Sequence, residues 1–286
     1  MSNTTTIITG ASTGIGAGIA RRLGAAGHRL VLAARRQTEL ERVGDEATRA
    51  GSPGVLIVPT DVTRRDDVQA LSERAIAEFG GYDVWINNAG RGITRSVLDV
   101  SDDDFDQIMA VNVKSALYGM QFAARHFIDR GHGQIINVSS FLGRVPLALH
   151  RSAYNAAKAA LNSLTANLRT ELANRSSDIH VTLVMPGMVN TDFARNALNA
   201  PPGTGGYAGP HVQTIEQVAD MVLDVIEHPV AELYTNPASR AMAEKYLENP
   251  TIFDAPGSNP WMPRTTAPTR AESGAAQDPL PRRDTA

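Results

Sequence analysis

Thr9-Gly10-Ala11-Ser12-Thr13-Gly14-Ile15-Gly16 is the stretch of sequence from which the fold can be worked out. It joins an apolar run that reads as a strand, Thr6–Thr9, to an amphipathic run that reads as a helix, Ile15–Ala26. Glycines at such a junction let the chain turn sharply and bring backbone N–H groups against a pyrophosphate, whose charge the helix N-terminus favours. A plain tight turn would explain the glycines equally well, so their place between first strand and first helix carries the inference.

Short apolar runs and longer amphipathic runs alternate along most of the chain. Six short runs read as buried strands: Thr6–Thr9, Arg29–Ala33, Val55–Pro59, Val84–Ile86, Gln134–Val138 and Val181–Met185. Six longer runs have apolar residues spaced three and four apart and read as helices: Ile15–Ala26, Thr38–Ala50, Asp66–Phe79, Asp102–Ile128, Ala153–Asn174 and Ile215–Ile226. Regular alternation predicts an α/β fold, a doubly wound parallel sheet of about seven strands with helices on both faces.

Local signals mark helix starts and the limits of the domain. Thr63–Asp66 has the layout of a capping box, and Ser101 precedes three aspartates at a positive helix end. The Gly/Pro cluster Pro201–Gly206 predicts a flexible loop. From Asn249 the sequence turns to Pro, Thr, Ala, Gly and Arg without periodicity. We therefore expect one catalytic domain over residues 1–248 and a Pro-rich, mobile tail over residues 249–286.

The bulk composition excludes several classes of protein and site. The chain has 286 residues, 42% hydrophobic and 20% charged, as an ordinary globular protein does. A net charge of −3 gives no broad basic field, so we expect no nucleic-acid partner and no membrane partner. The absence of cysteine excludes disulfides and thiolate catalysis, and the scattered histidines predict no metal site.

Nothing in the sequence reads as a membrane or export signal. No stretch reaches the roughly 18 uninterrupted apolar residues that span a bilayer. The polar start, Met1–Thr6, lacks the charged and then apolar layout of a secretory signal. We expect a cytoplasmic location.

The end of the second predicted strand carries two cations, Arg35 and Arg36. In dinucleotide-binding folds an acid at this place grips the adenosine ribose, whereas an arginine accommodates a 2′-phosphate. Charge-assisted contacts with that phosphate would favour NADP(H) over NAD. The alternative is that both arginines are simply the solvated start of the next helix.

Tyr154 and Lys158 lie four residues apart at the start of a predicted helix, so phenol and ammonium share one face. Free tyrosine has a pKa of about 10 and is a poor base at neutral pH. A fixed cation, joined by the charge of an oxidised nicotinamide, would favour the phenolate and make proton transfer useful. In isolation, a half-buried tyrosine beside a surface lysine would explain the pair as well.

The context of the pair favours chemistry, because polar or glycine-rich turns follow four predicted strands. Besides the first turn, Asn87–Gly90 follows one strand, Ser139 and Ser140 follow another, and Pro186–Thr191 follows a third. Carboxyl ends of parallel strands meet at one edge, where open α/β sheets bind their ligands. One of the two serines can hold a substrate oxygen there.

Together these motifs resemble the short-chain dehydrogenase/reductase family, in its single-domain Rossmann-type branch with the T-G-x-x-x-G-x-G motif. The resemblance runs from about Thr6 to Ile226 and includes Asn-Asn-Ala-Gly, Tyr-x-x-x-Lys and Pro-Gly in order. It implies an NADP(H)-dependent oxidoreductase that moves a hydride between nicotinamide and a ketone or secondary alcohol. It also implies a homodimer or homotetramer, and small residues on the Tyr154 helix could let helices pair.

The resemblance assigns roles to individual residues. Tyr154 would be the general acid and base, and Lys158 would bind the nicotinamide ribose and lower the tyrosine pKa. Ser140, rather than Ser139, would polarise the substrate carbonyl, and Asn112 would support a water in a proton relay. The predicted cofactor-binding residues are Gly10, Ser12, Thr13, Gly14, Ile15, Gly16, Arg35, Arg36, Asp61, Val62, Asn88, Ala89, Gly90, Tyr154, Lys158, Pro186, Gly187, Val189 and Thr191.

Two other interpretations stay open at this point. One is an NAD-dependent alcohol dehydrogenase of the same fold, and the other is a cofactor-binding sensor or scaffold without turnover. The complete set Asn112, Ser140, Tyr154 and Lys158 argues against a pure binder. Around the substrate we expect an apolar pocket from Phe141, Leu142, Val145, Leu149, Met188, Phe193 and Tyr207, with His150 nearby at the surface.

Overall fold

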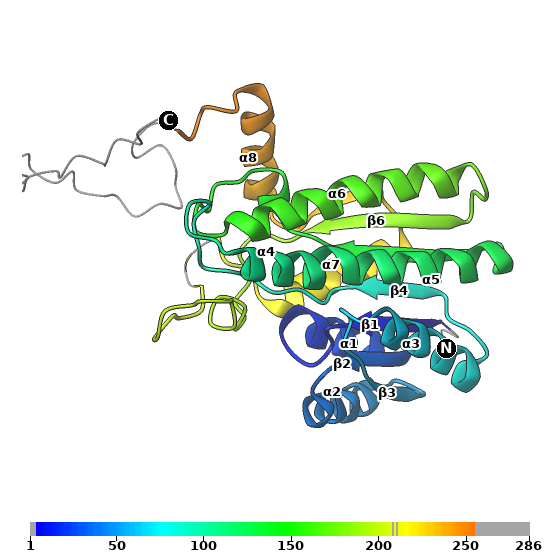
Figure 1. The fold of residues 1–286 in the computed structure, drawn as a ribbon. Coiled ribbons are helices and arrows are strands. Elements are labelled where there is room, and N and C mark those ends of the chain that lie inside the picture. The colour runs from blue at the N-terminus through cyan, green and yellow to red at the C-terminus, as the bar shows by residue number, and fades with distance from the viewer. Residues whose placement is uncertain (1–3, 208, 210, 255–286) are drawn as a thin grey trace, which may run out of the picture.

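The computed structural model describes residues 4–207, 209 and 211–254 (Figure 1). Within them, seven strands form one parallel sheet in the order β3-β2-β1-β4-β5-β6-β7. The strands are β1 (Thr5–Thr9), β2 (Arg29–Ala34), β3 (Val55–Pro59), β4 (Val84–Asn87), β5 (Gly133–Val138), β6 (Ile179–Met185) and β7 (Glu232–Tyr234). The predicted fold class, a single-domain, doubly wound parallel sheet, is confirmed. Most of the predicted tail, residues 255–286, lies outside the described residues.

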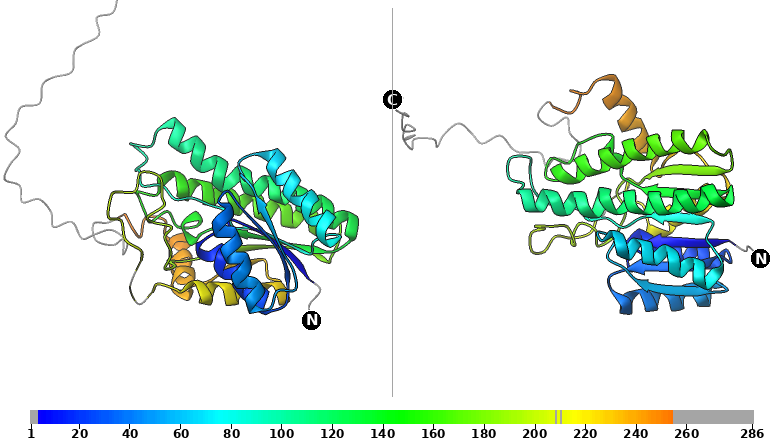
Figure 2. Two further views of the ribbon diagram at one scale, coloured as in Figure 1. Left: turned by 90° about the horizontal axis from the view of Figure 1, so that it is seen from below. Right: turned by 45° about the vertical axis from the view of Figure 1, so that its right-hand side comes forward.

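Helices cover both faces of the sheet (Figure 2). The α-helices are α1 (Gly14–Ala25), α2 (Gln37–Ala50), α3 (Arg65–Phe79), α4 (Asp102–Met109), α5 (Ser115–Arg130), α6 (Ser152–Ala173), α7 (Ile215–Glu227) and α8 (Pro237–Glu248). Helices α1, α2 and α7 pack together on one face, and α3, α5 and α6 cover the other. No helix in the described part of the chain is long and apolar enough to cross a bilayer.

Side-chain alternation along the central strands separates the two cores. On β1, Ile7 points to the core beneath α3, α5 and α6, whereas Ile8 points to the core beneath α1, α2 and α7. On β2, the neighbours Val31 and Leu32 divide in the same way. Successive residues of a strand face opposite sides, so apolar runs without polar breaks are what a sheet buried on both faces requires.

The prediction of one continuous helix over Asp102–Ile128 is wrong. A π-helical turn, Ala110–Lys114, separates α4 from α5. Within it the Asn112 amide donates to the backbone oxygens of Ile108 (3.0 Å) and Arg91 (2.9 Å). A side chain that takes a helix carbonyl competes with the helical hydrogen bonds, and π turns relieve that competition.

Two further local predictions have different outcomes. Ser101 does cap α4, since its side chain accepts a hydrogen bond from the Asp104 backbone N–H at 3.2 Å. The capping box at Thr63 is wrong, because the α3 cap position is Arg64, without a side-chain hydrogen bond. The Thr63 hydroxyl instead donates to the Asp61 carboxylate at 2.7 Å. About seven strands were expected but only six were located, so the places of β7, which is three residues long, and of α8 were missed.

The strand order fixes where a ligand can bind. The chain runs outward from β1 to β2 and β3, then crosses back to β4 on the other side of β1. Connections leave in opposite directions at this switch point, which opens a crevice beyond the carboxyl ends of the strands. The loops after β1, β4, β5 and β6 all border that crevice.

Candidate active site

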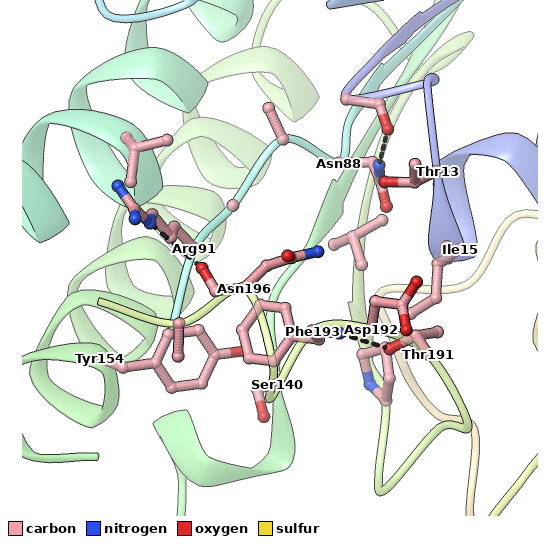
Figure 3. Close-up of a pocket in the computed structure, with 18 of the residues that line it drawn as sticks. Thr13, Ile15, Asn88, Arg91, Ser140, Tyr154, Thr191, Asp192, Phe193 and Asn196 are labelled. Atoms are coloured by element: carbon pink, nitrogen blue, oxygen red, sulfur yellow. Dashed lines mark hydrogen bonds between the residues drawn. The ribbon is translucent and has the colours of Figure 1, made fainter. Parts of the chain in front are cut away.

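A cavity of about 920 Å³ lies at the carboxyl ends of the strands. Figure 3 shows Tyr154, Ser140 and Phe193 grouped at one end and Thr13, Ile15 and Thr191 at the other. Every site residue predicted from the sequence lines this cavity except Gly16 and Asn112. A volume of this size suits a small-molecule or cofactor site.

The glycine turn after β1 forms the floor of one part of the cavity. A Cβ on Gly10 would lie 2.8 Å from the Ala89 Cα, and one on Gly16 would lie 2.4 Å from the Gly10 oxygen. These two glycines therefore allow the turn to pack against the loop after β4. A Cβ on Gly14 would make only an ordinary contact, 3.6 Å from the Thr191 Cγ2, so its φ of +57° is what calls for glycine.

The N-terminus of α1 opens into the same part of the cavity. Its cap residue, Thr13, is extended and makes no side-chain cap hydrogen bond, and the first turn holds no acid. The first N–H groups of a helix have no partner within it and carry partial positive charge. Together with the glycine cradle, they fit the pyrophosphate of a dinucleotide.

The loop after β4 is fixed to the turn after β1. The Thr9 hydroxyl accepts hydrogen bonds from the backbone N–H groups of Asn88 (3.1 Å) and Ala89 (3.2 Å). In return, the Asn88 side-chain amide donates to the backbone oxygen of Thr9 at 3.0 Å. The cradle is therefore held in shape by the protein's own bonds.

Two arginines and one aspartate face the cavity beyond β2 and β3. Arg36 donates to the Ser12 hydroxyl at 3.4 Å and pairs with Glu39 at 3.5 Å, and both Arg35 and Arg36 are exposed. Burial would raise the pKa of Asp61, but hydrogen bonds from Thr63 and the charge of Arg35 lower it overall. Cations thus outnumber the single ionised acid at this end of the cavity.

Tyr154 lies buried in the first turn of α6, at the opposite end. Burial raises the pKa of its phenol to about 12, against the lowering effects of a hydrogen bond with Ser140 and the charge of Arg151. The lowering expected from Lys158 together with an oxidised nicotinamide stays a prediction for the cofactor complex. In the protein alone desolvation dominates, so at neutral pH the phenol keeps the proton that a general acid needs.

Lys158 shares the wall with Tyr154, as the spacing of four predicts. Its Nζ lies 5.7 Å from the centre of the tyrosine ring and donates to the Val138 backbone oxygen at 2.9 Å. Burial lowers the pKa of this ammonium to about 7. Desolvation thus favours the neutral amine, and an anionic group beside Lys158 would favour the ammonium form.

The two serines after β5 have different surroundings. Ser139 donates to the Asn162 side chain and to the Lys158 backbone oxygen (3.3 Å), which ties β5 to α6. Ser140 accepts from the Leu142 backbone N–H at 3.2 Å and is the hydrogen-bond partner of Tyr154. Ser140 is therefore the serine beside the phenol.

Asn112 is buried and does not line the cavity. Its side chain forms hydrogen bonds with backbone groups. Besides its two donated bonds, its Oδ1 accepts from the Arg91 N–H at 3.2 Å. A Cβ on Gly90 would lie 2.9 Å from this oxygen and 3.5 Å from the Lys158 Nζ. Asn112 thus positions the chain at Gly90, next to the lysine, and its predicted water relay stays a prediction.

The expected apolar pocket is formed in part. Five of the seven residues line the cavity, namely Phe141, Leu142, Met188, Phe193 and Tyr207. Val145 is instead fully buried in the core, and Leu149 is exposed beside a separate groove. His150 is exposed and does not line the cavity.

Arg151, the residue after His150, lines the cavity and was missed. It is only 5% exposed and occupies the cap position of α6. A cation is unfavourable at the positive end of a helix, and this was the available signal in the sequence. No cluster of three or more His, Cys, Asp or Glu side chains that could hold a metal occurs among residues 4–207, 209 and 211–254.

Comparisons with known proteins agree with this fold. The model of the short chain dehydrogenase family matches residues 4–201. An uncharacterized oxidoreductase of Bacillus subtilis (strain 168) is 32% identical over 238 residues, 83% of this chain and 66% of that protein. The chain therefore spans about two thirds of that relative's length.

Two solved structures resemble the fold closely. One is a short chain dehydrogenase/reductase from Burkholderia phymatum in complex with NAD, with TM-score 0.76, 27% identity, and coverage of 86% of this chain and 94% of that one. The other is an alcohol dehydrogenase from the archaeon Thermococcus sibiricus complexed with 5-hydroxy-NADP, with TM-score 0.71, 25% identity, and coverage of 82% and 97%.

Proposed function

Because this chain belongs to the short chain dehydrogenase family, we propose that it is an NADP(H)-dependent oxidoreductase acting on a ketone or secondary alcohol. The observation that carries the proposal is the buried phenol of Tyr154 beside Ser140 and Lys158 in the large cavity. This is the arrangement that proton transfer to a carbonyl oxygen needs.

Different residues of the chain have different roles in carbonyl reduction. A nicotinamide dinucleotide bound in the cavity supplies the hydride for reduction and accepts it in oxidation. The Ser140 hydroxyl donates a hydrogen bond to the substrate oxygen and stabilises the negative charge that develops there. Tyr154 then gives its proton to that oxygen, and in oxidation it takes the proton back.

Lys158 acts on the charge that this transfer leaves behind. A phenolate forms on Tyr154 as the proton departs, and an ammonium on the same wall stabilises it. Asn112 and Gly90 keep the chain beside the lysine in place. The role of Asn112 is therefore that of a positioning residue.

The preference for NADP(H) rests on Arg35 and Arg36. Both lie where the loop after β2 meets the cavity, and no carboxylate stands at the end of that strand. A 2′-phosphate there would gain two charge-assisted contacts, whereas NAD has no phosphate at this position to contact the two cations. One solved relative holds NAD and the other an NADP derivative, so these side chains carry the argument.

We also propose a homodimer or homotetramer that pairs through α6. Ala156, Ala159 and Ser163 are exposed along this helix, and such small side chains allow two helices to approach closely. Light scattering on the purified chain would give the mass of the assembly. A bulky change, Ala159→Arg, should lower that mass, and an unchanged assembly would exclude α6 as the contact.

A screen of carbonyl substrates tests the proposed function. Purified protein is mixed with NADPH or NADH and with aliphatic, aromatic, steroidal or quinone carbonyls, while loss of the reduced cofactor is followed by absorbance. We expect turnover with at least one class and faster turnover with NADPH. Binding of NADPH without turnover in any class would make the chain a sensor, and a preference for NADH would remove the argument from the arginines.

A further inference from the structure

The charge on Arg151 has no acidic partner among the described residues. The side chain is 5% exposed, yet none of the ion pairs in the described part of the chain includes it. Its Nη1 donates to the Ile93 backbone oxygen at 3.1 Å, and its Nη2 donates to the Tyr207 hydroxyl at 3.3 Å. Both acceptors are neutral oxygens, so neither of these bonds brings a negative charge to the guanidinium.

This position is electrostatically poor for a cation. Burial removes the solvent that would stabilise the charge, and hydrogen bonds to neutral oxygens restore only part of that stabilisation. Arg151 also stands at the N-terminus of α6, a 22-residue helix whose first turn holds no acid. The helix end is positive and adds to the unfavourable potential. An anion from outside the chain would offset both the desolvation of the guanidinium and the positive potential of the helix end.

Other cations line the same cavity. Arg91 and Arg195 are among its lining residues, and Asp192 lies beside Thr191 (Figure 3). Asp192 pairs with Arg195 at 3.1 Å, so its charge is already matched. A cleft lined by one sign of charge concentrates ligands of the opposite sign.

Phe193 connects the cation to the reacting centre. Its ring centre lies 5.4 Å from that of Tyr154 and 6.0 Å from the Arg151 guanidinium carbon. The phenol and the guanidinium thus flank one phenyl ring at the wall of the same cavity. A molecule that reaches both groups needs only a few carbons between its carbonyl and its anionic group.

We propose that the substrate is a short oxo acid, or the corresponding hydroxy acid, whose carboxylate binds Arg151 while its carbonyl lies at Tyr154 and Ser140. The planar fork of a guanidinium matches a carboxylate through two parallel hydrogen bonds. The inference rests on the proposed function and adds the class of substrate to it. Arg151 is the residue that determines this specificity.

Matched substrates and matched variants test the proposal. Each oxo acid of a series with growing chain length is compared with its own methyl ester, in the presence of NADPH. We expect the wild-type protein to prefer the acid, and Arg151→Gln to lower the acid-to-ester ratio of kcat/KM by about 100-fold, mainly through KM. Arg151→Lys keeps the charge but not the fork and should fall between the two.

Arg195→Gln is the control variant, because it removes a cation that lines the same cavity but already has an acidic partner. We expect it to change the acid-to-ester ratio by less than about threefold, since an exposed pair contributes little. The thermal midpoint and NADPH affinity of each variant show whether the fold is intact. Should Arg151→Gln not fold, the Arg151→Lys variant alone decides the question.

The outcomes separate this proposal from the proposed function. Equal loss on acids and esters in the Arg151 variants would mean that Arg151 supports only the loops or the phenol, and would overturn the inference. Equal use of acids and esters by the wild type would overturn it too. Turnover of neutral ketones with no preference for acids would leave the proposed function standing, whereas no turnover of any carbonyl would defeat both.

Discussion

The two ends of the cavity hold positive charge in different environments. Beyond β2, Arg35 and Arg36 are exposed and have polar or acidic neighbours. At the far end, Lys158 and Arg151 are 3% and 5% exposed, and their hydrogen-bond partners within the described part of the chain are neutral oxygens. Water and salt screen an exposed cation, whereas a buried one keeps its full field and its full desolvation cost.

This difference indicates what each end does. The exposed arginines can select among cofactors without a large effect on folding, because their contributions are small and independent. The buried cations destabilise the fold, so their presence indicates chemistry or ligand binding that depends on them. We therefore expect the effects of mutation to decrease from the buried end to the exposed end.

Tyr154→Phe should have the largest effect. The change removes the proton donor and keeps the ring that packs against Phe193. We expect kcat for ketone reduction to fall by about a thousandfold, the range of a general acid. Fluorescence titration should give a similar NADPH affinity for both proteins. Equal turnover in the variant would show that the proton comes from another group.

Lys158→Met tests the cost of the buried ammonium. Since the folded pKa is about 7, below the ordinary lysine value, the unfolded chain binds more protons between these two values. The stability of the wild type should therefore rise with pH across this window, relative to the variant. We expect a difference of about 1 kcal/mol per pH unit from pH 7 upward, in urea unfolding curves.

The same variant has a second, catalytic readout. Loss of the cation beside the phenolate should lower kcat by about a hundredfold at neutral pH. The expected protein is thus more stable at neutral pH and less active. A variant that is destabilised at every pH would mean that the ammonium is held by favourable bonds, and the contrast between the two ends would not hold.

Arg35→Asp should have the smallest effect. An acid at this exposed place repels a 2′-phosphate and can accept hydrogen bonds from ribose hydroxyls. We expect the NADPH-to-NADH ratio of kcat/KM to fall by about tenfold, with a smaller change at high salt. Thermal unfolding should be unchanged within about 1 °C. An unchanged NADPH-to-NADH ratio of kcat/KM in this variant would show that Arg35 does not contact the cofactor.

Sequence alone reveals those features of both ends that depend on local geometry. The glycine turn is readable because Gly10 and Gly14 have positive φ, a property of the backbone that neighbouring residues do not alter. The Tyr154–Lys158 pair is readable because helical spacing alone puts both on one face. These features depend on local geometry, which the order of residues contains directly.

The features that were missed depend on contacts between distant segments. The π turn at Asn112 was missed, and its side chain also bonds the distant backbone of Arg91. Arg151 was missed too, and its bonds go to Ile93 and Tyr207. Ser140 was predicted, but the contact that holds Ser139, with Asn162 across β5 and α6, was not. Such contacts have no local pattern and become visible only after the chain has folded.

The pH dependence of kcat/KM in both directions tests the role of Tyr154 most directly. Reduction needs a protonated phenol, so its rate constant should fall as pH rises through the tyrosine pKa in the cofactor complex. Oxidation needs the phenolate, so its rate constant should rise through the same pKa. The predicted result is that kcat/KM for reduction falls and kcat/KM for oxidation rises around the same pKa. In Lys158→Met, both transitions should move to higher pH. Profiles that are flat, or that change in the same sense in both directions, would contradict Tyr154 as the proton donor and acceptor.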